Sequence, residues 1–147
     1  GSAMCFLQKV GIRQIARYES GLYEYLVKRL CRIPGILLYG AGDSACHAPF
    51  VTFNLEGVPY QTLAQCLGDE YGIAVASGTS GANLYVQDLL GLTDSQAFAL
   101  YQSGQNYGIG RASIGLFNSC SDIDRLIDAL QAVACASKYR RKIKTAK

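Results

Sequence analysis

The sequence predicts an α+β domain with two layers, in which a short, mostly antiparallel sheet of three or four strands is packed by helices on one face. Three observations support this class. The predicted elements follow the order helix, strand, strand, helix, strand, two helices, strand, helix; the strands are short; and the helices are apolar on one side. With 147 residues, half of them apolar and 17% charged, the chain can form a single domain with a buried core.

The first predicted element is a long helix over residues 6–30. Gly11 and Gly21 weaken it, and either could mark a break or a bend. Pro34-Gly35 stops it. Its apolar residues recur close to helical spacing, at Ile12, Ile15, Leu22, Leu26 and Leu30.

Two strands are predicted next, over residues 36–39 and 48–54, with a glycine-rich turn at residues 40–43 between them. In the second strand, Phe50 and Phe53 are expected to give one aromatic face. A helix is predicted to begin at Pro59, because proline suits the first helical position. Its expected buried side consists of Leu63, Cys66 and Leu67.

A third strand is predicted over residues 73–78, and it leads into a glycine-rich loop over residues 78–83. The loop lacks the lysine and the spacing of a phosphate-binding P-loop, so a tight turn of small residues is the preferred interpretation. A short helix over residues 84–90 follows. Thr93 and Gln96 then have the spacing of a capping box at the start of another helix.

The last strand and helix are predicted from Arg111-Ala112-Ser113-Ile114-Gly115-Leu116-Phe117-Asn118-Ser119. Ala112, Ile114 and Leu116 alternate with Ser113, Gly115 and Phe117, so both sides are apolar or small, which is typical of a strand covered on both faces. Asn118 or Ser119 offers an oxygen as the N-cap of the helix, and Asp122 lies three residues after Ser119. The apolar stripe of this helix is Ile123, Leu126, Ile127, Leu130 and Val133.

Arg111 is a lone cation at the start of this otherwise uncharged strand. Two interpretations are open. A strand-end arginine can simply reach solvent. Alternatively, the guanidinium can bind a carboxylate through two parallel hydrogen bonds.

The two ends of the chain are treated separately from the domain. Residues 1–4, Gly-Ser-Ala-Met, are interpreted as a cloning scar, and residues 5–137 are assigned to the domain. Residues 138–147 form a basic tail with six of the 14 Lys and Arg and no acid, so the net charge of +3 belongs to the tail. A solvated tail is the preferred interpretation, and nucleic acid is not expected as a partner. No apolar run reaches the ~20 residues that span a membrane.

The six cysteines are scattered, with no Cys-x-x-Cys pair and a single histidine, so no metal site is predicted. Cys31, Cys66 and Cys135 lie in helical patterns, where small buried apolar residues are common. Reduced thiols in the cytoplasm are therefore expected.

The motif from Arg111 to Ser119, followed by Asp122-Ile123-Asp124, resembles the closing motif of the class V aminotransferase superfamily, pyridoxal-phosphate enzymes that include the cysteine desulfurases. The resemblance spans roughly residues 6–133 and implies the small C-terminal domain of such an enzyme. It also implies that Arg111 binds the α-carboxylate of an amino-acid substrate.

The chain departs from the desulfurase pattern in residues 72–82, which resemble the loop that carries the desulfurase cysteine. Gly81 occupies the position of that nucleophile, and Ala76 that of an arginine that assists carboxylate binding. Glycine has no thiolate, so no catalytic residue is predicted here. Thr79, Ser80 and Asn83 remain as candidate substrate-binding residues of the same loop.

Pyridoxal phosphate needs a Schiff-base lysine, a carboxylate at the pyridine nitrogen and a phosphate cup, which the resemblance assigns to a large domain. No cofactor is therefore expected in this chain alone. The expected partners are that large domain, in the same protein or in a homodimer, and an amino-acid substrate. The alternative is a non-catalytic module for protein interaction or regulation derived from the same domain.

Overall fold

The structure is a computed structural model that describes residues 1–40 and 48–145, with side chains described to residue 137. The turn expected at residues 40–43 therefore lies largely outside the described residues. The described part of the chain contains these helices and strands: α1 (Ser2–Val10), α2 (Ile12–Leu30), β1 (Ile36–Tyr39), β2 (Phe50–Leu55), α3 (Tyr60–Tyr71), β3 (Ala76–Gly78), α4 (Asn83–Leu89), α5 (Asp94–Gln102), β4 (Ile109–Ser113) and α6 (Cys120–Thr145).

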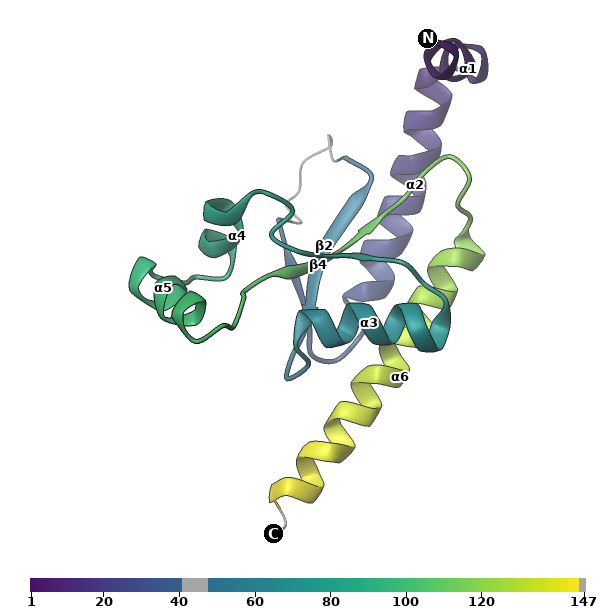
Figure 1. Cartoon of the computed structure of the whole chain (residues 1–147). Helices are drawn as coiled ribbons and strands as arrows, with labels where there is room; N and C mark the ends of the chain where they lie inside the picture. Colours follow the sequence, from purple (N-terminus) through teal and green to yellow (C-terminus); the bar gives the residue numbers. More distant parts are fainter. Residues whose placement is uncertain (41–47, 146–147) are drawn as a thin grey trace.

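The strands form one sheet in the order β1-β2-β4-β3, and each neighbouring pair is antiparallel. The predicted α+β class is thus confirmed. Because β3 and β4 pair directly, α4 and α5 form an excursion between two neighbouring strands. In Figure 1 this excursion lies on the side of the sheet away from α2 and α6.

One face of the sheet packs on α2, α3 and α6 and forms the core (Figure 1). Along β2, Val51, Phe53 and Leu55 are buried, while the residues between them are more exposed. The expected aromatic face is therefore wrong, because Phe50 and Phe53 point to opposite sides. The helices contribute Leu22, Leu26, Leu30, Leu63, Leu67, Ile123, Leu126, Ile127 and Leu130 to the core.

The strand predicted from Arg111 to Phe117 is displaced toward the N-terminus. β4 spans Ile109–Ser113, and the chain leaves the sheet before Phe117, which is 84% exposed. The expectation of two covered faces is wrong at the C-terminal end of β4, where Ala112 is buried and Ser113 exposed, whereas Ile109 and Gly110 at its start are both buried. Similarly, only the last three residues of the strand predicted over residues 73–78 pair with a neighbour.

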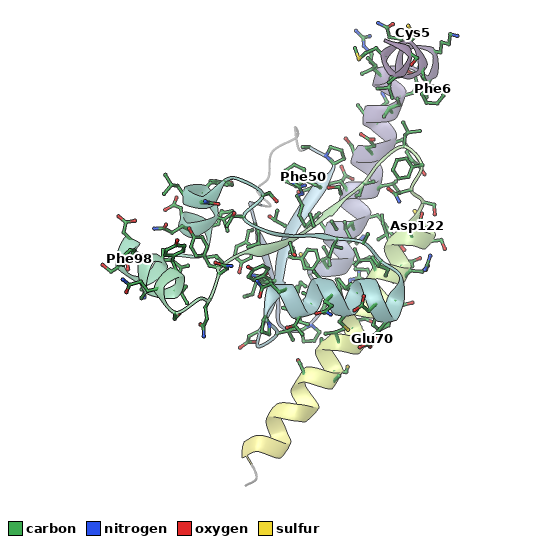
Figure 2. All side chains as sticks on the ribbon, viewed as in Figure 1. Cys5, Phe6, Phe50, Glu70, Phe98 and Asp122 are labelled. Atoms are coloured by element: carbon green, nitrogen blue, oxygen red, sulfur yellow. The ribbon has the colours of Figure 1, made fainter. Side chains whose placement is uncertain are left out.

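The long first helix is broken at Gly11, where φ is 98°, so α1 and α2 are separate helices. Figure 2 shows Cys5 and Phe6 on α1, away from the sheet. Ile12 is 56% exposed and Ile15 only half-buried, because α2 begins well beyond the sheet that buries its second half. Residues 2–4, interpreted from the sequence as part of a scar, lie within α1 and are helical.

The helix starts predicted after Thr93 and Ser119 are confirmed, whereas α3 begins at Tyr60 and has Pro59 as its N-cap and not as its first residue. Thr93 and Gln96 form a capping box at α5. At α6, the Asp122 carboxylate accepts hydrogen bonds from the backbone N–H of Ser119 at 2.9 Å and from its hydroxyl at 3.0 Å. These hydrogen bonds, that from the backbone first, hold the pKa of Asp122 below its usual value.

A polar contact joins α2 to α6. The Tyr25 hydroxyl donates to the Asp124 carboxylate at 2.7 Å, and Arg29 forms an ion pair with the same carboxylate at 3.1 Å. The hydrogen bond to Asp124 raises the pKa of Tyr25, because the hydroxyl must keep its proton to donate.

The cysteines differ from the expectation of burial. Cys31 and Cys135 are exposed and Cys66 is half-buried. Cys5 and Cys120 are also exposed, the four exposed cysteines are free thiols, and Cys46 lies outside the described residues. Cys31 follows the end of α2, and Cys135 lies next to the buried stripe of α6. None of the described helices is both long enough and apolar enough to cross a membrane.

Candidate functional site

Arg111 belongs to a row of side chains that crosses the whole sheet. Tyr39 of β1 pairs with Thr52 of β2, Thr52 with Arg111 of β4, and Arg111 with Ala76 of β3. Residues directly opposite each other in antiparallel strands point to the same face. This face is the one opposite the core residues of β2 and β4, so the row lies on the side of the sheet away from α2 and α6, where α4 lies.

The Arg111 guanidinium lies over the Phe50 ring, with 5.7 Å between its central carbon and the ring centroid. This distance is within the range of a cation–π contact, which holds the guanidinium plane against the ring. Its Nε is buried and has no hydrogen-bond partner. An unpaired buried donor costs about 1–3 kcal/mol, so an oxygen placed there would be stabilised.

The loop after β3 is a tight turn that ends beside this row. The backbone N–H of Ala82 donates to the carbonyl of Thr79 at 2.9 Å. The two residues between them both have positive φ, 50° at Ser80 and 81° at Gly81, as in a type I′ turn. The Thr79 hydroxyl donates to the side-chain oxygen of Asn83, which fixes the turn against the first residue of α4.

Three of the predicted site residues meet at one cavity. Arg111, Thr79 and Ser80 line a cavity of about 270 Å³ between β1, β2, β4 and α4. Asn83 does not line it, and neither does Gly81. A cysteine side chain in place of Gly81 would meet no heavy atom within 4 Å at its Cβ, so this position has free space.

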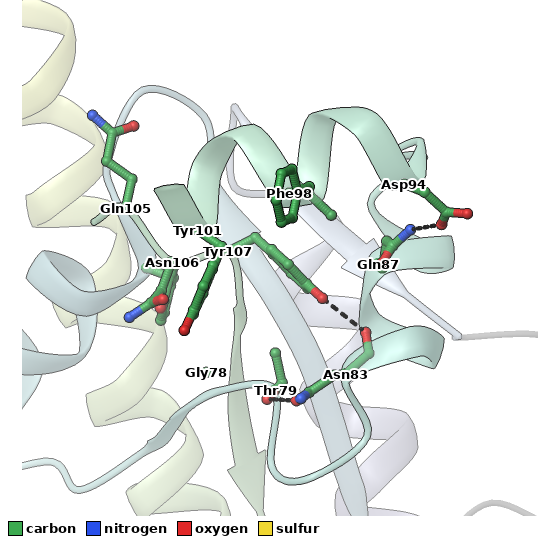
Figure 3. Close-up of a pocket in the computed structure, with 12 residues that line it drawn as sticks. Gly78, Thr79, Asn83, Gln87, Asp94, Phe98, Tyr101, Gln105, Asn106 and Tyr107 are labelled. Atoms are coloured by element: carbon green, nitrogen blue, oxygen red, sulfur yellow. Dashed lines mark hydrogen bonds between the residues drawn. The ribbon is translucent and has the colours of Figure 1, made fainter. Parts of the chain in front are cut away.

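Asn83 lies instead at a second cavity of about 630 Å³, which α5 and the segment before β4 enclose. Figure 3 shows Phe98, Tyr101 and Tyr107 around it, with Thr79 and Asn83 hydrogen-bonded at its edge. The Tyr107 hydroxyl donates to the Asn83 carbonyl at 3.5 Å. The four candidate substrate-binding residues are therefore divided between two cavities, with Thr79 at both.

The aromatic walls of the smaller cavity were not predicted from the sequence. Tyr39, Phe50 and Tyr85 line it together with Arg111. The aromatic pattern of β2 pointed to Phe50, but nothing in the local sequence separates Tyr39 and Tyr85 from the other eight tyrosines. The strand register is needed to place Tyr39 at the cavity. The course of the turn before α4 is needed to place Tyr85 there.

A model of the aminotransferase class-V family matches residues 1–126. The chain therefore belongs to the aminotransferase class-V family.

Among similar proteins, a cysteine desulfurase from Yersinia pseudotuberculosis is 30% identical over 133 residues, which are 90% of this chain and 28% of that protein. A cysteine desulfurase from Klebsiella pneumoniae is 29% identical, with the same coverage. The chain thus spans about 28% of the length of these relatives.

Solved structures of cysteine desulfurases also resemble this chain over a similar share of its length. The cysteine desulfurase CsdA from Escherichia coli superposes with a TM-score of 0.65 at 27% identity, over 88% of this chain and 28% of that chain. An apo cysteine desulfurase from Thermococcus onnurineus NA1 gives a TM-score of 0.66 over 89% of this chain and 28% of that chain, and at 23% identity it supports the fold alone.

The described residues do not suit pyridoxal phosphate by themselves. Lys9 and Lys28 are exposed on α1 and α2, and neither lines the cavity that contains Arg111. A Schiff-base lysine must be shielded next to the substrate. Within the described residues there is also no group of His, Cys, Asp or Glu side chains that could hold a metal ion.

Proposed function

We propose that the chain acts as the small, substrate-facing domain of a pyridoxal-phosphate-dependent class V enzyme and that Arg111 binds the α-carboxylate of an amino acid. The observation that carries this proposal is the Arg111 guanidinium, held over Phe50 with a buried and unpaired Nε at the edge of a cavity. The cofactor and its lysine would belong to a large domain, in the same polypeptide or in a partner. The free thiols support a reducing compartment such as the cytoplasm.

A carboxylate would supply a hydrogen-bond acceptor for the unpaired Nε of Arg111. Guanidinium binds a carboxylate through two parallel N–H donors. Because Nε is buried, a carboxylate would reach the edge that contains it only after neighbouring side chains shift. The hydroxyls of Thr79 and Ser80 lie at the same cavity and could donate to the amino acid. With glycine at position 81, persulfide chemistry by the desulfurase route has no nucleophile in this loop.

The experiment is a titration of the chain with acetate, followed through the backbone amide NMR signals of Thr79 and Ser80, which line the same cavity and are present in every variant. We expect a saturable shift, and we expect Arg111→Ala to weaken acetate binding at least tenfold. Arg111→Lys should restore only part of it, because lysine lacks the planar pair of donors. Acetamide, which has the same shape and no charge, should not bind.

Arg125→Ala is the matched control, because Arg125 is an exposed arginine on α6 away from the cavity. This variant should bind acetate as the parent chain does. Equal acetate binding by Arg111→Ala and Arg125→Ala would disprove the carboxylate role.

A second candidate is the non-catalytic interaction module, and α1 favours it. This helix has no buried residue, and Met4, Phe6 and Val10 are between 44% and 56% exposed. Apolar residues gathered at one end of a protein are typical of an interface. If a second copy of the chain covers them, sedimentation velocity should detect a dimer that Phe6→Ser disrupts; a monomer at all concentrations would count against this candidate.

A further inference from the structure

We infer that the cavity beside Arg111 selects an amino acid with a bulky apolar side chain, aromatic or branched aliphatic, over one as small as alanine or cysteine. This inference rests on the proposed carboxylate role of Arg111. It concerns the side chain of the amino acid, which the carboxylate does not define, and it is argued from the residues that line the cavity.

Aromatic side chains from four different elements line the cavity, one of them Tyr23 of α2. Tyr39 comes from the end of β1, Phe50 from the start of β2 (Figure 2) and Tyr85 from α4. Aliphatic side chains of Val86 and Leu89 continue the wall along α4. Walls of this kind with a few placed polar groups are typical of small-molecule sites.

The polar side chains that line the cavity come from the sheet and from the turn after β3, with Thr52 of β2 beside Arg111. Arg111, Thr79 and Ser80 come from β4 and from the turn after β3, whereas Val86 and Leu89 lie one and two helical turns further along α4. A ligand whose carboxylate reaches Arg111 would therefore direct its side chain toward the apolar walls. Small residues at the rim, Gly78 and Ala82, leave room for it.

The charges limit the ligand as well. Among the described residues that line this cavity, Arg111 is the only one with a charged side chain. A second carboxylate or an ammonium on the ligand's side chain would enter apolar surroundings without a partner, which is unfavourable. A side chain of one or two heavy atoms would leave most of the approximately 270 Å³ unfilled and would forgo the apolar contacts.

The test compares L-alanine, L-leucine, L-phenylalanine and L-glutamate as ligands of the full chain, again through the backbone amide signals of Thr79 and Ser80. We expect phenylalanine and leucine to bind at least tenfold more tightly than alanine, as an apolar pocket discriminates by about this factor or more for each added methylene. Glutamate should bind no better than alanine.

Tyr85→Ala tests the wall directly. Tyr85 is 60% exposed, so its loss should leave the fold intact. We expect the ratio of the phenylalanine affinity to the alanine affinity to fall severalfold in this variant. Tyr101→Ala is the matched control, because Tyr101 is an exposed tyrosine that lines the other cavity.

The outcomes separate the two proposals. Equal affinities for alanine and phenylalanine, both abolished by Arg111→Ala, would overturn the side-chain inference and leave the carboxylate role standing. Phenylalanine binding that ignores Arg111→Ala would overturn both. Tight phenylalanine binding that depends on Arg111 and Tyr85 would support both.

Discussion

Ala76 and Arg111 lie directly opposite each other in the antiparallel pair of β3 and β4, so their side chains leave the same face of the sheet. Residues opposed in this way have Cβ atoms about 4.5–5.5 Å apart. The family resemblance places an assisting arginine at position 76, and the register shows that such an arginine would stand next to Arg111. The pairing of β3 with β4 would thus place two arginines side by side, although in this chain only position 111 of the pair is an arginine.

The Ala76→Arg variant should therefore bind acetate more tightly than the parent chain, by about threefold to tenfold. Without ligand it should be less stable, by about 0.2–1 kcal/mol, because like charges directly opposite each other repel. Urea denaturation with and without acetate measures both effects. Ser77→Arg is the control, since Ser77 is the exposed neighbour whose side chain leaves the other face. If both variants changed acetate affinity equally, general charge rather than register would be responsible.

The second prediction concerns the contact between α2 and α6. Tyr25→Phe removes the hydroxyl that donates to Asp124, and we expect it to lower the urea midpoint. Tyr101→Phe should not, because Tyr101 is 73% exposed on α5 and lies away from this contact.

The same contact predicts a dependence on pH. The pKa of Tyr25 is raised above its ordinary value of 10.0 by the hydrogen bond to Asp124. A raised folded-state pKa means that the stabilisation is complete below pH 10 and is lost as the pH rises through the folded-state pKa. The stability of the parent chain should thus fall more steeply above pH 10 than that of Tyr25→Phe. Parallel curves would contradict the assignment.

Substitution of two glycines by alanine should change the stability of the fold in opposite directions. A Cβ on Gly108 would lie 2.7 Å from the Gly78 Cα and 2.8 Å from the Tyr60 ring, so Gly108→Ala should destabilise by about 1–3 kcal/mol. Gly21 lies inside α2, where an added Cβ would have no heavy atom within 4 Å, so Gly21→Ala should stabilise by about 0.5–1 kcal/mol. Thermal unfolding of both variants tests the pair, and a loss of stability in Gly21→Ala would contradict the open space on this side of α2.

Periodicity was enough to predict the class of the fold and most of its helices, because an apolar stripe must be buried wherever it occurs. The stripe on α6 and the capping box at Thr93 are local patterns of this kind. The end of β4 was missed because nothing local shows where pairing with β2 stops. Similarly, the exposure of Ile12 depends on how far α2 extends past the sheet, which is a property of the assembled domain.

The candidate site was predictable only where the residue type carries the chemistry. Arg111 stood out as a lone cation, and the turn residues Thr79 and Ser80 stood out as polar groups in a glycine-rich loop. The walls of the cavity come from segments far apart in the sequence, so their proximity depends on strand order. Asn83 was assigned to the same site, but its side chain is engaged by Thr79 at the other cavity.

The last prediction concerns Gly81, which occupies the position of the desulfurase cysteine in the family resemblance. Its φ of 81° disfavours any residue with a Cβ, by about 1–2 kcal/mol, yet a Cβ there would meet no atom within 4 Å. Backbone conformation alone should therefore set the cost of a side chain. We expect Gly81→Cys to fold, with the free energy of unfolding lowered by about 1–2 kcal/mol and one additional alkylatable thiol. Gly81→Asn should cost less, because asparagine tolerates this conformation better.

Chemical denaturation and mass spectrometry after brief alkylation measure the two effects. Equal losses for cysteine and asparagine would indicate a steric obstacle instead of backbone strain, and a cysteine variant that failed to fold would contradict the open space around the turn. If the variant folds with an accessible thiol, the loop can accommodate a cysteine at the position of the desulfurase nucleophile. This chain would then differ from that pattern in the side chain at position 81 and not in the shape of the turn.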